Sequence, residues 1–228
     1  MPTLTVTRSS GGRSKPVPMT YVDPSQLVID TPPALEGSGL NAPFLMDVLS
    51  AMLAHERGGA ALYRAVAARS LNPVLQRQYR HFGEETVEHV SILEMLVANA
   101  GGDPMYVSPS ARATERAGNS VIETTFMCSG SIDLMTAELV MLEAVILAEV
   151  KDHSNWSMLS QLVPKLPESL RTSFADATAR VEQQEEEHLS WAKDMRSKMI
   201  TLQIQSGAMQ KAGVAAEEMM AKIKSLFD

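Results

Sequence analysis

Residues 185–188 read Glu-Glu-Glu-His, and residues 84–89 read Glu-Glu-Thr-Val-Glu-His. Each stretch lies in a long segment of good helix formers, in which apolar residues recur every three or four positions. Two more acidic stretches lie in segments of the same kind: His55-Glu56, and residues 149–153, which read Glu-Val-Lys-Asp-His. The sequence therefore predicts four long helices, each of which carries at least one acid and one histidine.

Prolines and glycines separate these four segments and set the order of the helices. The helices are expected over residues 41–69, 73–98, 132–162 and 168–205. Short turns near Asn72 and Pro164 close each pair, whereas a long connection, residues 101–130, joins the two pairs and contains a short helix near 110–117. Two hairpins with one long connection predict an all-α fold, namely an antiparallel four-helix bundle with one long crossover.

Two flanking segments differ in composition from this bundle, which is expected to span residues 41–205. Residues 1–40 are rich in Ser, Thr, Gly and Pro, and this predicts an extended N-terminal arm. The basic residues of the arm, Arg8, Arg13 and Lys15, make it a candidate for binding a partner. Residues 206–228 form an amphipathic segment, expected as a short C-terminal helix that packs on this chain or on a neighbouring subunit.

The composition argues against several classes of function. The chain has 228 residues and a net charge of -7. An acidic chain is not expected to bind nucleic acid, because phosphate contacts need clustered Lys and Arg. No run of about 18 apolar residues is present, so no membrane span is expected. A single cysteine, Cys128, and the lack of a basic start followed by an apolar run favour a cytoplasmic protein.

The acids and histidines of the four helices are expected to lie at one level of the bundle. At a rise of about 1.5 Å per residue, Glu56 and His89 both lie roughly 22–24 Å from the turn between their helices. Glu149 and Glu185 agree in level within about one helical turn. Glu56 and Glu149 lie in apolar stretches, so they are expected to be buried and to need a partner. The neighbouring acids are expected at the surface: Glu84, Glu88, Glu186 and Glu187.

The two hairpins also look like related halves. Tyr63 follows Glu56 by seven residues, and Trp156 follows Glu149 by seven. Both aromatic residues either line the acidic level or belong to the ordinary core. Gly58-Gly59 lowers helix stability, which indicates a close approach between helices or an opening toward the acidic level.

This combination resembles the ferritin-like superfamily of di-iron and di-manganese proteins, including its rubrerythrin-like, manganese-catalase-like and stress-related members. In their scheme two helices supply one Glu each, and the other two supply Glu-x-x-His. The resemblance implies a metal centre made by Glu56, Glu85, His89, Glu149, Glu185 and His188.

The second helix departs from this scheme, because Thr86 stands three residues before His89, where a Glu is expected. Glu85, four residues before His89, shares its helix face and is therefore the predicted bridging carboxylate. His153, four residues after Glu149, is a further candidate: as an extra ligand, as a partner of a ligand, or as a surface residue.

The resemblance also implies two Fe or Mn ions per chain that react with oxygen or peroxide, in a ferroxidase, peroxidase or catalase-like reaction. Carboxylates suit hard cations and imidazole suits iron and manganese, so this donor set favours these metals over copper. Glu56, Glu149 and Tyr63 are the candidate catalytic residues. A homo-oligomer is expected, with a dimer as the first guess. The alternative, kept open by Thr86, is a non-catalytic bundle that acts in stress protection or in partner binding.

Overall fold

The computed structural model describes residues 3–6, 17–20, 32–127 and 133–205, and within these residues the fold is all-α apart from one small strand pair. The long helices are α1 (Ala42–Arg69), α2 (Pro73–Asn99), α3 (Pro109–Met127), α4 (Leu134–Leu162) and α5 (Glu168–Gln205). Two short 3-10 turns are η1 (Pro33–Leu35) and η2 (Val163–Lys165). Strands β1 (Thr3–Val6) and β2 (Val17–Thr20) pair antiparallel, with Thr3 opposite Thr20.

Side-chain caps stabilise the N-terminal ends of the first two helices. The side chains of Asn41 and Asn72 accept hydrogen bonds from backbone N–H groups in the first turns of α1 and α2. The turn between these helices is held by Glu138 of α4, whose Oε1 accepts hydrogen bonds from the Ser70 hydroxyl (2.9 Å) and the Leu71 N–H (2.8 Å). The α1–α2 turn is thus tied to the second hairpin by a buried acid.

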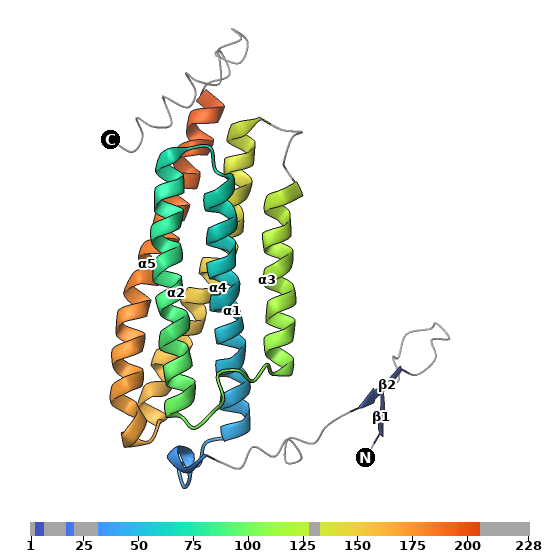
Figure 1. Ribbon diagram of the computed structural model, residues 1–228, viewed down its shortest axis with the longest axis vertical. Coiled ribbons are helices and arrows are strands. Elements are labelled where there is room, and N and C mark those ends of the chain that lie inside the picture. The colour runs from blue at the N-terminus through green and yellow to red at the C-terminus, as the bar shows by residue number, and fades with distance from the viewer. Residues whose placement is uncertain (1–2, 7–16, 21–31, 128–132, 206–228) are drawn as a thin grey trace.

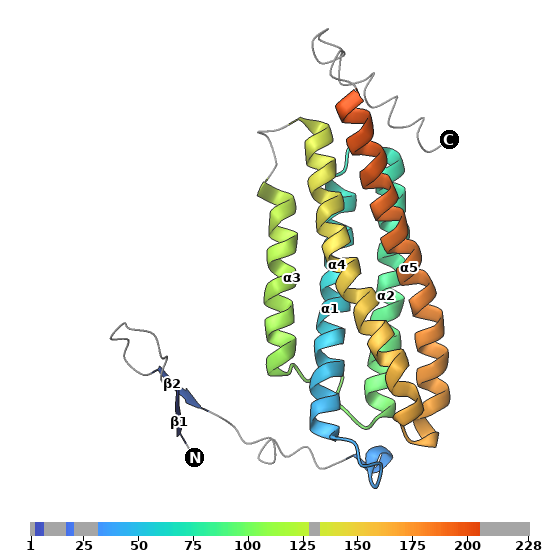
Figure 2. The ribbon, with the colours of Figure 1, turned by 180° about the vertical axis from the view of Figure 1, so that it is seen from behind.

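Four of the helices pack around a shared interior (Figures 1 and 2). Helix α1 lies against α2, and α4 lies against α5, with only short links between the members of each pair. Further contacts join α1 to α4 and α2 to α5, so the two hairpins face each other. Residues from all four helices therefore meet inside.

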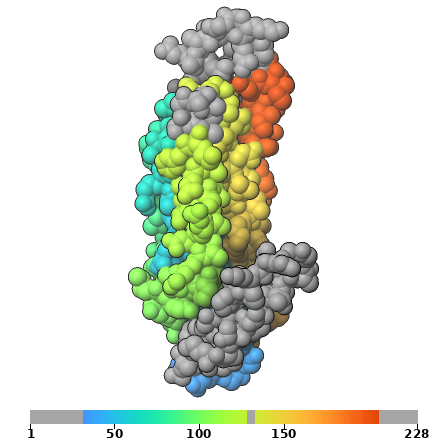
Figure 3. All heavy atoms as spheres, turned by 90° about the vertical axis from the view of Figure 1, so that its right-hand side faces the viewer, coloured from blue at the N-terminus to red at the C-terminus, as the bar shows by residue number. Residues whose placement is uncertain are grey.

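Helix α3 lies on the outside of this arrangement, against α1 and α4 (Figure 3). It spans 19 residues, whereas the sequence predicted only a short helix near 110–117. Ser108 begins the helix, because its hydroxyl accepts a hydrogen bond from the Ala111 N–H (3.0 Å) while its own N–H donates to the Ser50 hydroxyl (3.1 Å). Its buried residues, Ala111 and Thr125, are small, so the helix adds few large side chains to the core.

The N-terminal arm joins the folded unit earlier than expected. Leu35, in η1, is buried in the core, although residues 1–40 were predicted as an extended arm. Pro32 lies against Gly101, where a Cβ would come within 2.4 Å of the proline ring. Gly101 also has a φ of 83°, a backbone conformation that favours glycine. The predicted C-terminal segment, 206–228, lies outside the described residues.

Two apolar clusters fill the interior, and a layer of buried polar residues separates them. Along α1, Leu53 belongs to the first cluster and Leu62 to the second, with the fully buried Glu56 between them. Along α5, Val181 and Ala192 take the same places on either side of Glu185. Each cluster contains residues of α1, α2, α4 and α5. No helix in the described part of the chain is both long enough and apolar enough to cross a membrane.

Candidate metal centre

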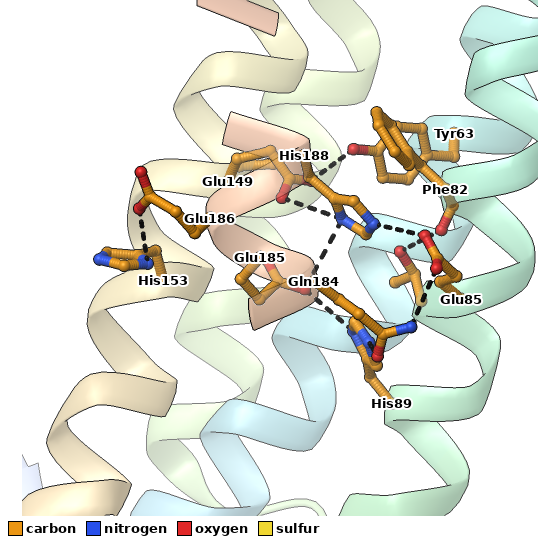
Figure 4. Close-up of polar contacts among 12 residues, drawn as sticks. Tyr63, Phe82, Glu85, His89, Glu149, His153, Gln184, Glu185, Glu186 and His188 are labelled. Carbon is orange, nitrogen blue, oxygen red and sulfur yellow. Dashed lines mark hydrogen bonds and ion pairs between the residues drawn. The ribbon is translucent and has the colours of Figure 1, made fainter. Parts of the chain in front are cut away.

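Two groups of three buried side chains lie in the polar layer between the apolar clusters. The first contains Glu56 of α1, His89 of α2 and Glu185 of α5; the second contains Glu149 of α4 with Glu185 and His188 of α5. Within each group one ligand atom per residue lies within 4.8 Å of the others, a spacing that fits a metal ion. The two groups share Glu185, so four helices converge on one centre (Figure 4).

Atoms that face this centre lack hydrogen-bond partners, although all five residues are buried. They are Nδ1 of His89 and His188, Oε2 of Glu56 and Glu149, and both carboxylate oxygens of Glu185. The closest approaches are 2.9 Å between His89 Nδ1 and Glu185 Oε1, and 3.5 Å between His188 Nδ1 and Glu149 Oε2. Buried polar atoms without partners are costly, so the arrangement fits residues that bind cations.

The outer nitrogens of both histidines are joined by one chain of hydrogen bonds (Figure 4). His89 Nε2 donates to the Gln184 carbonyl (3.1 Å), and the Gln184 amide donates to Glu85 Oε1 (2.9 Å). His188 Nε2 donates to the other oxygen of Glu85 (2.9 Å). Because acceptors outside the centre engage both Nε2 atoms, the Nδ1 atoms are the ring nitrogens left to bind a metal. Burial acts to lower the pKa of His188, but contacts with Glu149 and then Glu85 raise it above its usual value, so metal binding would compete with a proton there.

Two aromatic residues donate hydrogen bonds to Glu149 and Glu56, and each bond reaches across to the facing helix. The Tyr63 hydroxyl of α1 donates to Glu149 Oε1 on α4 (2.8 Å), and the Trp156 indole of α4 donates to Glu56 Oε1 on α1 (2.6 Å). In each case the other carboxylate oxygen remains free for the centre. The spacing of seven residues noted in the sequence therefore places each aromatic beside the acid of the facing helix.

The buried acids of the layer alter one another's pKa values. Burial, followed by the charges of Glu56 and Glu149, raises the pKa of Asp152 well above its usual range. Burial, with the charges of Asp152 and then of Glu149, does the same to the pKa of Glu185. Burial also acts to raise the pKa of Glu149, but contacts with His188 outweigh it and the pKa lies below its usual value. Bound cations would relieve this crowding of acids.

Glu85 and His153 lie outside both triads. Glu85, the predicted bridging carboxylate, contacts the outer nitrogen of His188, and its side chain is 20% exposed. Burial acts to raise the pKa of Glu85, but hydrogen bonds from His188 and Gln184 bring it below its usual value. His153 is 39% exposed and lies 3.8 Å from Glu186, which agrees with the surface position among the three roles left open for it.

Helix geometry explains the position of His153. At about 100° per residue, Asp152 and Trp156 lie roughly 60° and 20° to one side of Glu149, and His153 lies roughly 40° to the other. Asp152 and Trp156 are buried, so the interior lies on their side of the helix.

The four neighbouring acids that were expected at the surface are exposed, as predicted: Glu84, Glu88, Glu186 and Glu187.

Asp152 and Gln184 are functional candidates that the sequence reasoning missed. Asp152 is 4% exposed and carries a carboxylate oxygen without a hydrogen-bond partner. Its signal was present, because it follows Glu149 by three residues and thus shares a helix face with it. Gln184 gave no signal, since a glutamine on a charged helix is typical of the surface.

Gly59 lies at a close approach between two helices, whereas the cavity beside Gly58 is lined by no residue of the two triads. A Cβ on Gly59 would lie 3.3 Å from the Thr86 methyl group, so α1 and α2 approach closely here. Gly58 has open space beside it and lines a cavity of about 210 Å³ between α1, α3 and α4. Gly59, Ala148 and Lys151 also line this cavity, next in sequence or close to residues of the polar layer.

Comparison with known protein families, with curated proteins and with solved structures gave no significant match to this chain, so its centre is defined by its own residues and their geometry.

Proposed function

We propose that this chain is a ferritin-like four-helix bundle, with α3 in its one long crossover, that binds two iron or manganese ions and reacts with oxygen or peroxide. Helices α1, α2, α4 and α5 would form the bundle, and each contributes at least one buried Glu or His to the centre. Four helices with inward carboxylates and histidines are the arrangement that dimetal proteins of this class use.

The observation that carries the proposal is the sharing of Glu185 by the two triads. A carboxylate has two oxygens, and both oxygens of Glu185 are buried without hydrogen-bond partners. Glu185 would therefore help to hold both ions. Glu56 and His89 would help to hold one of them, and Glu149 and His188 the other.

The donor set selects the class of metal. Two imidazole nitrogens with several carboxylates suit iron or manganese, whereas the absence of thiolate donors from both triads disfavours copper(I) and most structural zinc. When bound, such ions supply redox chemistry and open coordination positions to oxygen or peroxide. The flanking apolar clusters exclude bulk water from the layer.

Glu56, Glu149 and Tyr63 are the candidate catalytic residues. The Tyr63 hydroxyl donates a hydrogen bond to Glu149 in a fully buried contact. Burial and then the charge of Glu149 raise the pKa of Tyr63 well above its usual value. The hydroxyl therefore stays protonated, orients Glu149 and remains a hydrogen-bond donor beside the centre. Trp156 orients Glu56 in the same manner.

Elemental analysis of the full chain, purified with iron and manganese available and after anaerobic reconstitution, tests the proposal directly. We expect about two ions of one metal per chain, and oxygen or peroxide consumption that depends on them. The exposed Glu186→Gln is the matched control and keeps both ions. Fewer than about half an ion per chain would contradict the proposal.

The mass of the protein in solution, measured by light scattering, tests the expected dimer.

Thr86 favours the second candidate function, a non-catalytic bundle that acts in stress protection or partner binding. Its hydroxyl donates to the Phe82 carbonyl of its own helix (2.8 Å), so position 86 offers no carboxylate to a metal. This function predicts a stable metal-free fold whose biological effect survives Glu56→Gln and Glu149→Gln. Loss of the effect in both variants would exclude it.

A further inference from the structure

Among the described residues, Asp152 of α4 is a buried acid of the polar layer that belongs to neither triad. It is 4% exposed, and its Oδ1 is buried without a hydrogen-bond partner. No ion pair to Asp152 occurs in the described part of the chain, although Lys151 is its neighbour in sequence. The Lys151 ammonium donates instead to the Asn155 side chain. A buried carboxylate without a cationic partner is costly, so its presence calls for an explanation.

The surroundings of Asp152 place it on the Glu56 side of the centre. Among the charges that act on Asp152, that of Glu56 is the strongest and that of Glu149 follows. Asp152 is in turn the charge that acts most strongly on Glu185. Glu56 and Glu185 belong to the triad of His89, so Asp152 interacts with two members of that triad, although its own oxygens lie outside the set of ligand atoms within 4.8 Å of one another.

The charge of the centre gives the same result. The triads contain three carboxylates, Glu56, Glu149 and Glu185, together with two neutral imidazoles. Two divalent ions in this buried layer would leave one positive charge in excess. Among the buried acids alone, the carboxylate of Asp152 balances this excess; Glu85, which is 20% exposed, adds its charge from the outer side of His188.

The residue at position 86 explains why the carboxylate comes from α4. Thr86 lies three residues before His89, the position at which Glu185 precedes His188. Its methyl group lies against Gly59, and its hydroxyl is engaged with the Phe82 carbonyl. Helix α2 therefore supplies no inward acid at this level, whereas α4 supplies two, three residues apart.

We propose that Asp152 is a metal ligand, the fourth carboxylate of the centre, and that it binds the ion held by Glu56, His89 and Glu185. The assignment rests on the proposed dimetal function. Asp152 thus takes the part that the residue at position 86 cannot take. Tight binding of both ions then requires both acids of the Glu149-x-x-Asp152 pair.

The test compares Asp152→Asn and Asp152→Glu with the wild-type chain by anaerobic metal titration and elemental analysis. The wild type and Asp152→Glu are expected to bind about two ions per chain, and Asp152→Asn about one ion tightly, with at least about tenfold weaker binding of the other. Circular dichroism confirms that each chain folds. The exposed Asp176→Asn is the control for loss of an acid and retains both ions.

The outcomes separate this inference from the function on which it rests. Two ions of unchanged affinity in Asp152→Asn overturn the assignment but leave the dimetal function standing. One ion in both variants also overturns it, because the loss then follows from altered packing rather than from the missing charge. A wild-type chain that binds no metal overturns the dimetal function, and the assignment of Asp152 with it.

Discussion

The α1–α2 hairpin and the α4–α5 hairpin carry matching residues at most positions of the polar layer. Glu56 corresponds to Glu149, and His89 corresponds to His188. An aromatic residue seven positions after each single Glu reaches the acid of the other hairpin. Two of the differences between the hairpins lie at buried positions or in close helix contact. Three residues before the histidine stands Thr86 in the first and Glu185 in the second, and three residues after the single Glu stands Gly59 in the first and Asp152 in the second.

This difference separates two tasks. In the first hairpin, Gly59 and Thr86 touch each other and allow α1 and α2 to approach closely. In the second hairpin, Asp152 and Glu185 are both buried acids that act on each other. One hairpin therefore gives close packing at these positions, and the other gives negative charge. The number of inward carboxylates need not be divided equally between two related halves.

The largest effect is expected where the second hairpin serves both ion positions. Glu185→Gln removes the carboxylate that the two triads share, so we expect the bound metal to fall from about two ions to fewer than about half an ion per chain. Elemental analysis after anaerobic reconstitution measures this. Glu186→Gln, a change of the exposed neighbour, is the control. Retention of both ions would show that Glu185 does not bridge.

A smaller effect is expected from the contacts outside the centre that link the two histidines. Glu85→Ala removes the acceptor of His188 Nε2 and frees the Gln184 amide, so the orientation of both rings is less fixed. We expect about 10- to 100-fold weaker metal binding with an unchanged number of ions at saturation. Competition with a chelator measures the affinity, and the exposed Glu84→Ala is the control. Loss of an ion at saturation would instead make Glu85 a ligand.

The charge of the second hairpin predicts a pH dependence in the metal-free chain. Because the fold raises the pKa of Asp152, its contribution to stability is complete below the pKa of an unfolded Asp and is lost as pH rises through the folded value. Asp152→Asn avoids this loss. The variant is therefore expected to exceed the wild type in Tm by an amount that grows as pH rises above the pKa of an unfolded Asp, at roughly 2–4 °C per kcal/mol.

Thermal unfolding with a chelator present measures this difference, and Asp176→Asn is the matched change at an exposed position. A Tm difference of opposite sign, or one that shrinks with rising pH, would contradict the effect of burial on Asp152.

The smallest effect is expected in the first hairpin. Thr86→Val keeps the shape of the side chain against Gly59 and removes only the hydrogen bond to the Phe82 carbonyl. We expect a loss of about 1 kcal/mol or less in the free energy of unfolding and no change in bound metal. Chemical denaturation and elemental analysis check both points. A lost ion in this variant would show that the hydroxyl of Thr86 takes part in metal binding.

Much of this arrangement was predictable from the sequence. Apolar periodicity placed the helices of both hairpins, and the residue count from each turn placed Glu56, His89, Glu149 and Glu185 at one level. The spacing of three between Glu185 and His188 indicated a shared face. These features depend on helix geometry alone, which is regular enough for residue counts to give positions in space.

The remaining features depend on contacts between distant segments. Glu85 shares a face with His89, but its partners, Gln184 and His188, come from α5 and draw its carboxylate to the outer side of the centre. Helix α3 was predicted too short because its buried face is made of small residues. Asp152 had the right spacing from Glu149, but spacing alone did not show which side of α4 faces inward.

The division of the interior into two apolar clusters has a consequence for the maturation of the protein. Each cluster draws on all four main helices, so neither needs an ion in order to form. In small zinc domains, by contrast, the ion supplies most of the folding free energy. Under the proposed dimetal function, synthesis and activation would be separate events in time. A newly made chain would fold while metal is scarce, and the supply of metal, rather than the rate of translation, would set when it becomes active.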